Sequence, residues 1–164
     1  MGKIMWCLSK KEGLSFVEPN QNLANAYLLK SEQALESLRI NTIKDWRIAT
    51  AYYTMYFAVY SLLMKIGIKC EIHSCTLAFA KEFLSAYFTK EEIKFFEDAL
   101  QARTDTQYYV NREVPDEQYA AMVKRAPEVL VKCKSIILKL NEKKVREIRD
   151  ALGKEVEKKK LMLS

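Results

Sequence analysis

The sequence has few of the residues from which turns, loops and metal sites are built. It contains only 4 glycines and 3 prolines in 164 residues, which leaves little material for β-hairpins or for a glycine-rich phosphate loop. Its four cysteines include no Cys-x-x-Cys pair, and the run Cys70-x2-His73-x-Cys75 around the single histidine matches no standard zinc site. We therefore expect an all-α protein without metal or other cofactor, in which His73 caps or begins a helix.

Long apolar runs are also scarce. The longest uncharged run, residues 48–64, has 17 residues and is diluted by four tyrosines and three Thr or Ser residues, so it lies at the lower limit for a membrane-spanning helix. No apolar core follows the first basic residue, unlike in a signal peptide. We expect a cytoplasmic protein outside the membrane whose cysteines are reduced and act as small apolar residues. They are Cys7, Cys70, Cys75 and Cys133.

Residues 48–64 are instead predicted to form the central helix of a bundle. At helical spacing they place aromatic or aliphatic side chains on every face, including a line of Tyr52, Tyr56 and Tyr60. A helix that is apolar all round must be buried by several others. The length and a charged fraction of 29% fit one globular domain.

Apolar periodicity predicts an antiparallel bundle of about five helices. We divide the chain into an N-terminal extension (1–19), a helical bundle (20–140) and a charged helical tail (141–164) that frays. Pro127 lies within the long fifth helix and should kink or restart it. Helix ends are signalled, in chain order, by Asn20 or Asn22, Thr42 with Asp45, Gly67, and the capping box of Thr89 with Glu92.

The chain carries a moderate excess of positive charge. The formal net charge is +6, and +3 of it lies in residues 141–164, where eight Lys or Arg meet five Asp or Glu. Such an excess permits attraction to nucleic acid but is common on soluble proteins, so charge alone does not identify a ligand.

Arg103 is the residue that the apolar pattern does not explain. It lies on the same stripe of the fourth helix as Phe96 and Leu100, and arginine is rarely buried unless it is paired or used. A structural explanation is an ion pair with Asp98 or Asp105, or a buried stem at the bundle edge. The other explanation is that Arg103 has a functional role.

Three stretches of the chain, together with the order of its helices, resemble HEPN domains of the small stand-alone prokaryotic group. They are AYYTMYFAVYSLLMKIGIK, the His73-Ser74 step and ARTDTQYYV on the fourth helix, and the resemblance covers roughly residues 20–140. In that family the second helix often contains a Tyr-Tyr pair, matched here by Tyr52 and Tyr53. The fourth helix carries an arginine, then four to six residues, and then a histidine. Members are typically dimers. Many are ribonuclease toxins paired with a minimal nucleotidyltransferase antitoxin, and others are catalytically degenerate binding modules.

The resemblance places the family arginine on Arg103 and the family histidine on Tyr108, or on Tyr109 with one more spacer. This is a departure from the nuclease pattern, because metal-independent RNA cleavage needs a group that takes the 2′-OH proton near neutral pH. Tyrosine, with an ordinary pKa of about 10, does not take this proton near neutral pH. Residues 103 and 108 also lie roughly 140° apart around a helix, so they meet only if the helix is distorted or two chains share a cleft.

We therefore expect a HEPN-type protein of a toxin–antitoxin-like pair, a homodimer that binds RNA or nucleotide and a minimal nucleotidyltransferase, with a degenerate ribonuclease site. An active ribonuclease toxin that uses Arg103 with Tyr108 or Tyr109, and a purely structural helical dimer, are the alternatives. His73 could take part in catalysis only if it reached Arg103 across the bundle. The expected site residues are Arg103 and Tyr108 for catalysis, and Asp105, Tyr109, Tyr52, Tyr53 and His73 for ligand binding.

Overall fold

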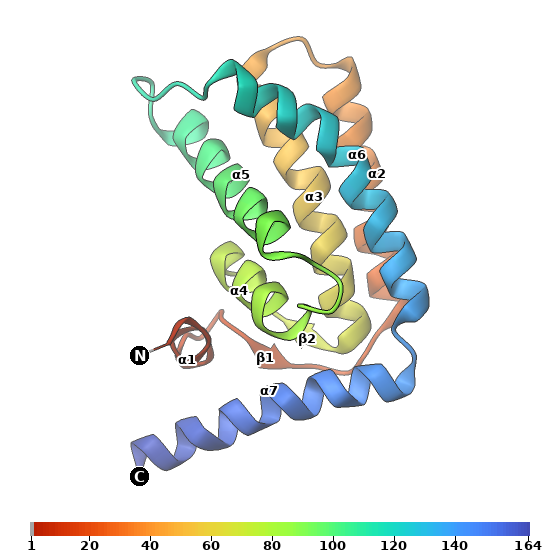
Figure 1. Ribbon diagram of the computed structural model, residues 1–164, viewed down its shortest axis with the longest axis vertical. Helices are drawn as coiled ribbons and strands as arrows, with labels where there is room; N and C mark the ends of the chain where they lie inside the picture. The colour runs from red at the N-terminus through yellow and green to blue at the C-terminus, as the bar shows by residue number, and fades with distance from the viewer. Residues whose placement is uncertain (1) are drawn as a thin grey trace.

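The computed structural model describes residues 2–164 and shows a bundle of helices with one small sheet (Figure 1). The predicted all-α class is confirmed in outline, although the N-terminal helix and the sheet were not expected. In chain order the elements are α1 (Lys3–Ser9), β1 (Ser15–Phe16), α2 (Gln21–Ile40), α3 (Lys44–Ile66), β2 (Ile68–Lys69), α4 (His73–Phe83), α5 (Lys90–Tyr108), α6 (Asp116–Lys139) and α7 (Glu142–Leu163).

The α3 helix is the centre of the bundle, as predicted. It packs against α2, α4, α5, α6 and α7 (Figure 1), and most of its residues are buried. Tyr52, Tyr56 and Tyr60 stack along it with ring centroids 5.7 and 5.9 Å apart. Aromatic side chains on successive turns therefore fill the space between α3 and its neighbours.

Several predicted helix ends are confirmed. The Asn20 side chain accepts a hydrogen bond from the Leu23 backbone at the start of α2. Thr89 and Glu92 form the reciprocal capping box of α5. Gly67 ends α3 with φ +86°, a conformation that glycine adopts without steric cost.

Other boundaries differ from the prediction. Thr42 does not cap α3, because the N-cap position is Ile43. The Ile43 backbone N–H donates a hydrogen bond to Asn41 Oδ1. Pro127 does not restart its helix, since α6 runs through it without a break.

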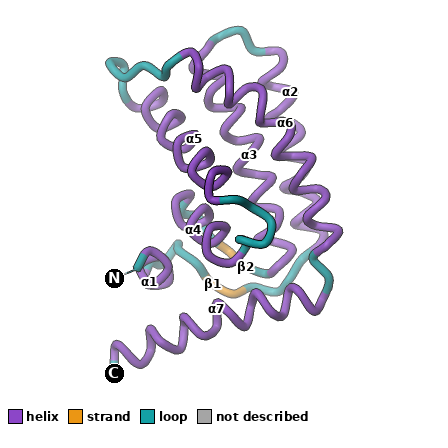
Figure 2. The backbone as a smooth tube through the Cα atoms, viewed as in Figure 1, coloured by secondary structure: helices purple, strands orange, loops and turns teal. Residues whose placement is uncertain are grey.

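The sheet joins the N-terminal extension to the segment after α3. β1 and β2 pair antiparallel, with Phe16 opposite Ile68 (Figure 2). Arg149 of α7 donates from Nη1 to the carbonyls of Val17, Ile66 and Gly67 at 2.8–3.2 Å. The predicted tail is thus a full helix that lies across this end of the bundle.

Two of the cysteines are not free thiols, contrary to our expectation. Cys7 and Cys75 form a disulfide that joins α1 to the first turn of α4, while Cys70 and Cys133 are free and buried. Apolar burial predicts the same environment for a thiol and a disulfide, so the sequence pattern could not distinguish them.

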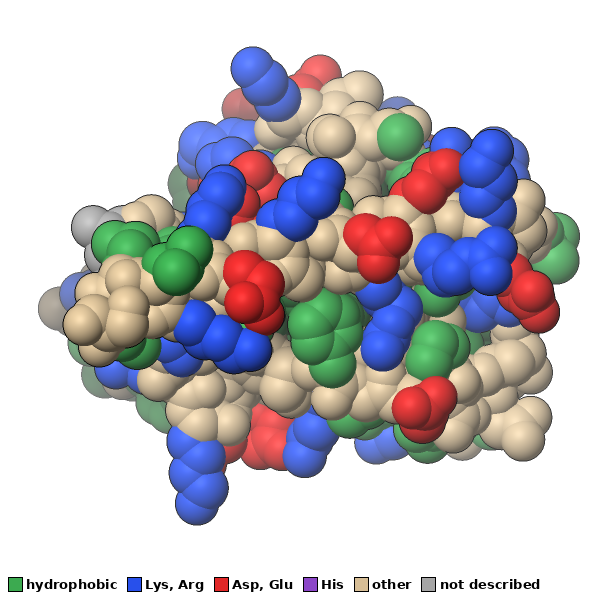
Figure 3. Space-filling view, turned by 90° about the horizontal axis from the view of Figure 1, so that it is seen from below, with side chains coloured by type: hydrophobic (Ala, Val, Ile, Leu, Met, Phe, Trp, Pro, Cys, Tyr) green, Lys and Arg blue, Asp and Glu red, His purple; other side chains and the backbone are tan. Residues whose placement is uncertain are grey.

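The outer face of α7 carries charges of both signs. Figure 3, seen from below, shows Lys or Arg and Asp or Glu side chains interspersed over this face rather than one basic surface. In residues 2–164, no helix combines the length and the apolar character that crossing a membrane requires.

Candidate functional site

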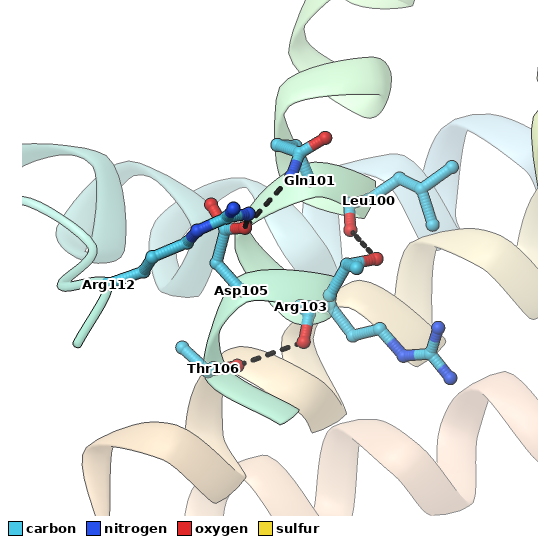
Figure 4. Close-up of polar contacts among 7 residues, drawn as sticks. Leu100, Gln101, Arg103, Asp105, Thr106 and Arg112 are labelled. Atoms are coloured by element: carbon cyan, nitrogen blue, oxygen red, sulfur yellow. Dashed lines mark hydrogen bonds and ion pairs between the residues drawn. The ribbon is translucent and has the colours of Figure 1, made fainter. Parts of the chain in front are cut away.

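The site is organised around Arg103, which α5 holds beside α3. Its guanidinium lies on the opposite side of α5 from Asp105 and Arg112 (Figure 4). α5 is a continuous helix to Tyr108, so no distortion brings Tyr108 onto the Arg103 face. In one chain these two residues point in different directions.

Arg103 contacts the tyrosine pair of α3. Its Nη2 donates to the Tyr53 hydroxyl at 2.7 Å, and its guanidinium carbon lies 5.3 and 5.8 Å from the ring centroids of Tyr53 and Tyr52. The buried Nε has no hydrogen-bond partner within residues 2–164. A guanidinium held by aromatic faces and one neutral hydroxyl keeps its full positive charge available to an anion.

Neither of the acidic partners considered for Arg103 pairs with it. Asp98 pairs with Lys94, and Asp105 accepts from Arg112 at 3.0 Å and from Gln101 at 2.9 Å (Figure 4). The structural ion pair offered as one explanation of Arg103 is therefore wrong. No carboxylate within the described residues neutralises this cation.

His73 reaches the same cluster from the start of α4. Its Nδ1 lies 2.8 Å from the Tyr52 hydroxyl, and its ring stacks on Tyr56 with centroids 3.9 Å apart. Its ring also meets Tyr53 edge-on at 6.2 Å. The structure thus brings together four of the predicted site residues, which we name the Arg103 cluster: Arg103, Tyr52, Tyr53 and His73.

The cluster keeps His73 neutral. Burial, with a smaller contribution from the nearby Arg103 charge, lowers the pKa of His73 to about 4. Burial also raises the pKa of Tyr52, so its phenol stays protonated. The Tyr52 hydroxyl hydrogen has no other acceptor within residues 2–164, and we assign it to His73 Nδ1, which places the imidazole proton on Nε2. At neutral pH, His73 is then a hydrogen-bond donor rather than a general base.

The remaining predicted residues lie apart from the cluster. Tyr108 is 65% exposed at the end of α5. The guanidinium carbon of Arg112 lies 3.7 Å from the centroid of the Tyr109 ring, and Asp105 pairs with the same arginine. The neighbouring Arg112 lowers the pKa of Asp105. The sequence does not predict the contact of Arg112 with Asp105, because helical periodicity says nothing about how the chain runs after the end of α5.

A cleft of about 600 Å³ is lined by residues of α1, α4 and α5 and by Glu155 of α7, and none of the four cluster residues lines it. Ser74, which follows His73, and Leu100, one turn before Arg103, both line it. Lys3 of α1 also lines the cleft, where its Nζ donates to the Ser74 hydroxyl at 3.1 Å. The cleft is large enough for a nucleotide-sized ligand.

Metal ligation is not supported by the arrangement of these residues. Cys75 of the Cys70-x2-His73-x-Cys75 run is in the disulfide, and His73 Nδ1 is bonded to Tyr52. Within residues 2–164 no three His, Cys, Asp or Glu side chains gather as a metal site requires.

No model of a known protein family matches this sequence, and no curated protein matches it significantly. The resemblance to HEPN domains therefore rests on the stretches quoted above, and membership of the family stays a prediction.

Proposed function

We propose that this chain is a HEPN-type protein that binds the phosphate groups of RNA or a nucleotide through Arg103. The observation that carries the proposal is a partly buried guanidinium with one neutral hydrogen-bond partner, Tyr53, and no carboxylate. Holding a cation away from water without a counterion is costly unless an anion completes the site. Arginine is suited to phosphate because its planar donors match the phosphate oxygens.

We propose binding without efficient cleavage. A metal-independent ribonuclease needs a base that titrates near neutral pH, whereas the pKa of His73 is held at about 4. Tyr108 does not share the Arg103 face of the continuous α5 helix. The alternative, an active ribonuclease that uses Arg103 with Tyr108 or Tyr109, requires a second chain to supply the tyrosine.

The binding test compares two arginines of the same region. Arg103→Ala should weaken binding of a fluorescein-labelled oligouridylate by at least tenfold in anisotropy titrations, since a charge-assisted bond to phosphate is worth about 1.5–3 kcal/mol. Arg112→Ala, which removes a cation already paired with Asp105, should change affinity by less than about threefold. Equal effects of the two substitutions would reject Arg103 as the phosphate-binding group.

Cleavage is measured in the same samples by denaturing gel electrophoresis. We expect intact RNA after prolonged incubation at pH 7. Cleavage that is lost in both Arg103→Ala and Tyr108→Phe would establish the active-ribonuclease alternative. If the protein neither binds nor cleaves RNA or nucleotides, the purely structural dimer is the remaining interpretation.

We also propose that the protein forms a homodimer and pairs with a minimal nucleotidyltransferase, as the resemblance implies. Exposed apolar side chains on α6, namely Val131 and Leu138, supply a surface of the kind that interfaces cover. Analytical ultracentrifugation tests the dimer. Copurification with a nucleotidyltransferase encoded next to this chain tests the pair.

The proposed compartment is the cytoplasm, and the disulfide makes it testable. Lasting disulfides are uncommon in reducing cytoplasm, so Cys7 and Cys75 are informative residues. Alkylation of free thiols in freshly lysed cells, followed by mass spectrometry, measures how much of the pair is oxidised in its native compartment.

A further inference from the structure

Two lysines lie over the ring of Trp6 on α1, and a third lysine contacts α1 from α7. Lys3 Nζ lies 4.1 Å and Lys10 Nζ 5.1 Å from the centroid of the Trp6 ring. Lys159 of α7 donates from Nζ to the Leu8 carbonyl at 2.8 Å. Within residues 2–164 none of these lysines has a carboxylate partner. We name Lys3, Trp6, Lys10 and Lys159 the α1 corner.

The α1 corner is fastened to the turn that carries His73. Lys3 Nζ donates to the Ser74 hydroxyl at 3.1 Å, and Ser74 is the next residue after His73. The Cys7–Cys75 disulfide fixes α1 to the same turn of α4. The α1 corner and the Arg103 cluster are therefore both joined to the first turn of α4, and Lys3 is the corner residue that lines the α1–α4–α5 cleft.

The carboxylates of this cleft are largely neutralised. Glu97 pairs with Lys81 at 3.8 Å, and Glu155 with Lys158 at 2.7 Å. Glu82 is the one lining carboxylate without a cation partner within the described residues. A strand of phosphates that crosses the cleft therefore meets the unpaired cation Lys3 and little net negative charge.

We infer that the α1 corner is a second RNA contact, so that a single strand runs from Arg103 across the cleft to Trp6. Surfaces that bind single strands combine cations along the phosphate backbone with aromatic rings on which bases stack. Trp6 is partly exposed. In this arrangement a base stacks on the face of the Trp6 ring, and the ammonium groups of Lys3 and Lys10 contact the phosphates. The inference rests on the proposed function, because Arg103 holds the other end of the strand.

The two tryptophans of the chain provide a matched pair for the test. Trp6 lies in the α1 corner, whereas Trp46 is 61% exposed near the start of α3, at the opposite end of the bundle (Figure 1). The probes are an oligouridylate of about twelve nucleotides and uridine 5′-monophosphate. Trp6→Ala should weaken oligouridylate binding about tenfold and leave monophosphate binding unchanged, and Trp46→Ala should change neither. Trp6→Tyr should restore most of the affinity.

The lysines are tested through the salt dependence of binding. Lys3→Gln and Lys10→Gln should each reduce the slope of log affinity against log salt by about 0.7 for a single strand. Lys90→Gln is the control, because Lys90 lies at the start of α5 and outside the α1 corner. Circular dichroism and titration of free thiols confirm that each variant is folded with the disulfide intact.

The possible results separate this inference from the proposed function. One result is that Arg103→Ala loses oligouridylate binding while Trp6→Ala and Trp46→Ala bind with equal affinity. This result overturns the proposal that the α1 corner contacts RNA, and it supports the phosphate site at Arg103. Dependence on Trp6 without dependence on Arg103 supports the corner and rejects the Arg103 site. The α1 corner also lies near the exposed side chains of Leu161, Met162 and Leu163, so phosphatidylserine vesicles are included. Trp6-dependent binding to vesicles but not to RNA would overturn the inference in favour of a lipid surface.

Discussion

Tyr52 and His73 are joined by a 2.8 Å hydrogen bond between the tyrosine hydroxyl and Nδ1 of the imidazole. The bond connects the central helix α3 to the first turn of α4, and Arg103 reaches the same tyrosine pair from α5. Three helices therefore meet at one polar cluster. Because its members also hold the bundle together, substitutions there should alter stability as well as binding.

Stability should fall in mild acid because of His73. Its pKa is 6.5 in the unfolded chain and about 4 when folded, so between these values the unfolded chain binds a proton that the folded protein does not. The contribution is complete above pH 6.5 and is lost as the pH falls toward 4. After allowance for partial solvent exposure we expect about 1–2 kcal/mol, measured by urea unfolding at pH 7 and pH 5.

Carboxylates also titrate in acid, so the informative quantity is the difference between wild type and His73→Gln. The variant should lose less stability than wild type between pH 6.5 and pH 5. Parallel stability curves for the two proteins over this range would show that His73 is not held neutral by its surroundings.

Tyr53→Phe removes the acceptor of the Arg103 guanidinium. The Arg103 Nη2 donor then loses its partner, and a partly buried donor without a partner costs about 1–3 kcal/mol. Tyr27→Phe is the control, because Tyr27 packs on Tyr60 through its ring and its hydroxyl makes no hydrogen bond within residues 2–164. Thermal unfolding that ranks the control as the more damaging change would contradict the assignment.

Gly67 and Gly153 should respond in opposite directions to alanine. A Cβ at Gly67 would lie 2.4 Å from Arg149 Nη1 and 2.5 Å from the Val17 carbonyl oxygen, at a positive φ. We expect Gly67→Ala to lower the free energy of unfolding by about 2–4 kcal/mol. Gly153 is within α7 with nothing near its missing Cβ, so Gly153→Ala should stabilise the protein by up to about 1 kcal/mol. Similar unfolding midpoints for the two variants would be inconsistent with the observed turn.

Reduction of Cys7–Cys75 should lower the melting temperature and loosen α1. The disulfide spans a sequence separation of 68, and closing such a loop in the unfolded chain is worth about 4 kcal/mol on the chain-entropy model. Hydrogen exchange should show faster exchange of α1 amides after treatment with a dithiol. The double variant Cys7→Ser/Cys75→Ser should not respond to the dithiol, and an equal response in wild type and variant would exclude the disulfide as the cause.

Local features of the fold could be predicted from the sequence. The Thr89–Glu92 capping box and the Gly67 helix end depend on residues a few positions apart, and both are confirmed. The burial of α3 follows from its uncharged, aromatic stretch of residues 48–64. By contrast, the Cys7–Cys75 pair joins residues 68 positions apart, and such contacts depend on how helices cross, which periodicity does not specify.

The site was predictable only in part, for the same reason. Arg103 stands out in sequence because a cation occupies an apolar stripe. Its freedom from a carboxylate could not be predicted, since Asp105 turns instead to Arg112 beyond the end of the helix. The approach of His73 to Tyr52 across 21 positions depends on the packing of α4 against α3, and no local pattern signals it.

Nuclear magnetic resonance of the Arg103 guanidinium tests the central claim most directly. The Nε–H signal, assigned by its absence in Arg103→Lys, is followed in ¹⁵N-labelled protein during titration with an oligouridylate of about twelve nucleotides. We expect a saturable shift of the Arg103 signal, because phosphate binding changes the charge around the guanidinium, and no shift of the Arg112 signal. RNA binding that leaves the Arg103 signal in place, or that moves the Arg112 signal instead, would contradict a phosphate site at Arg103.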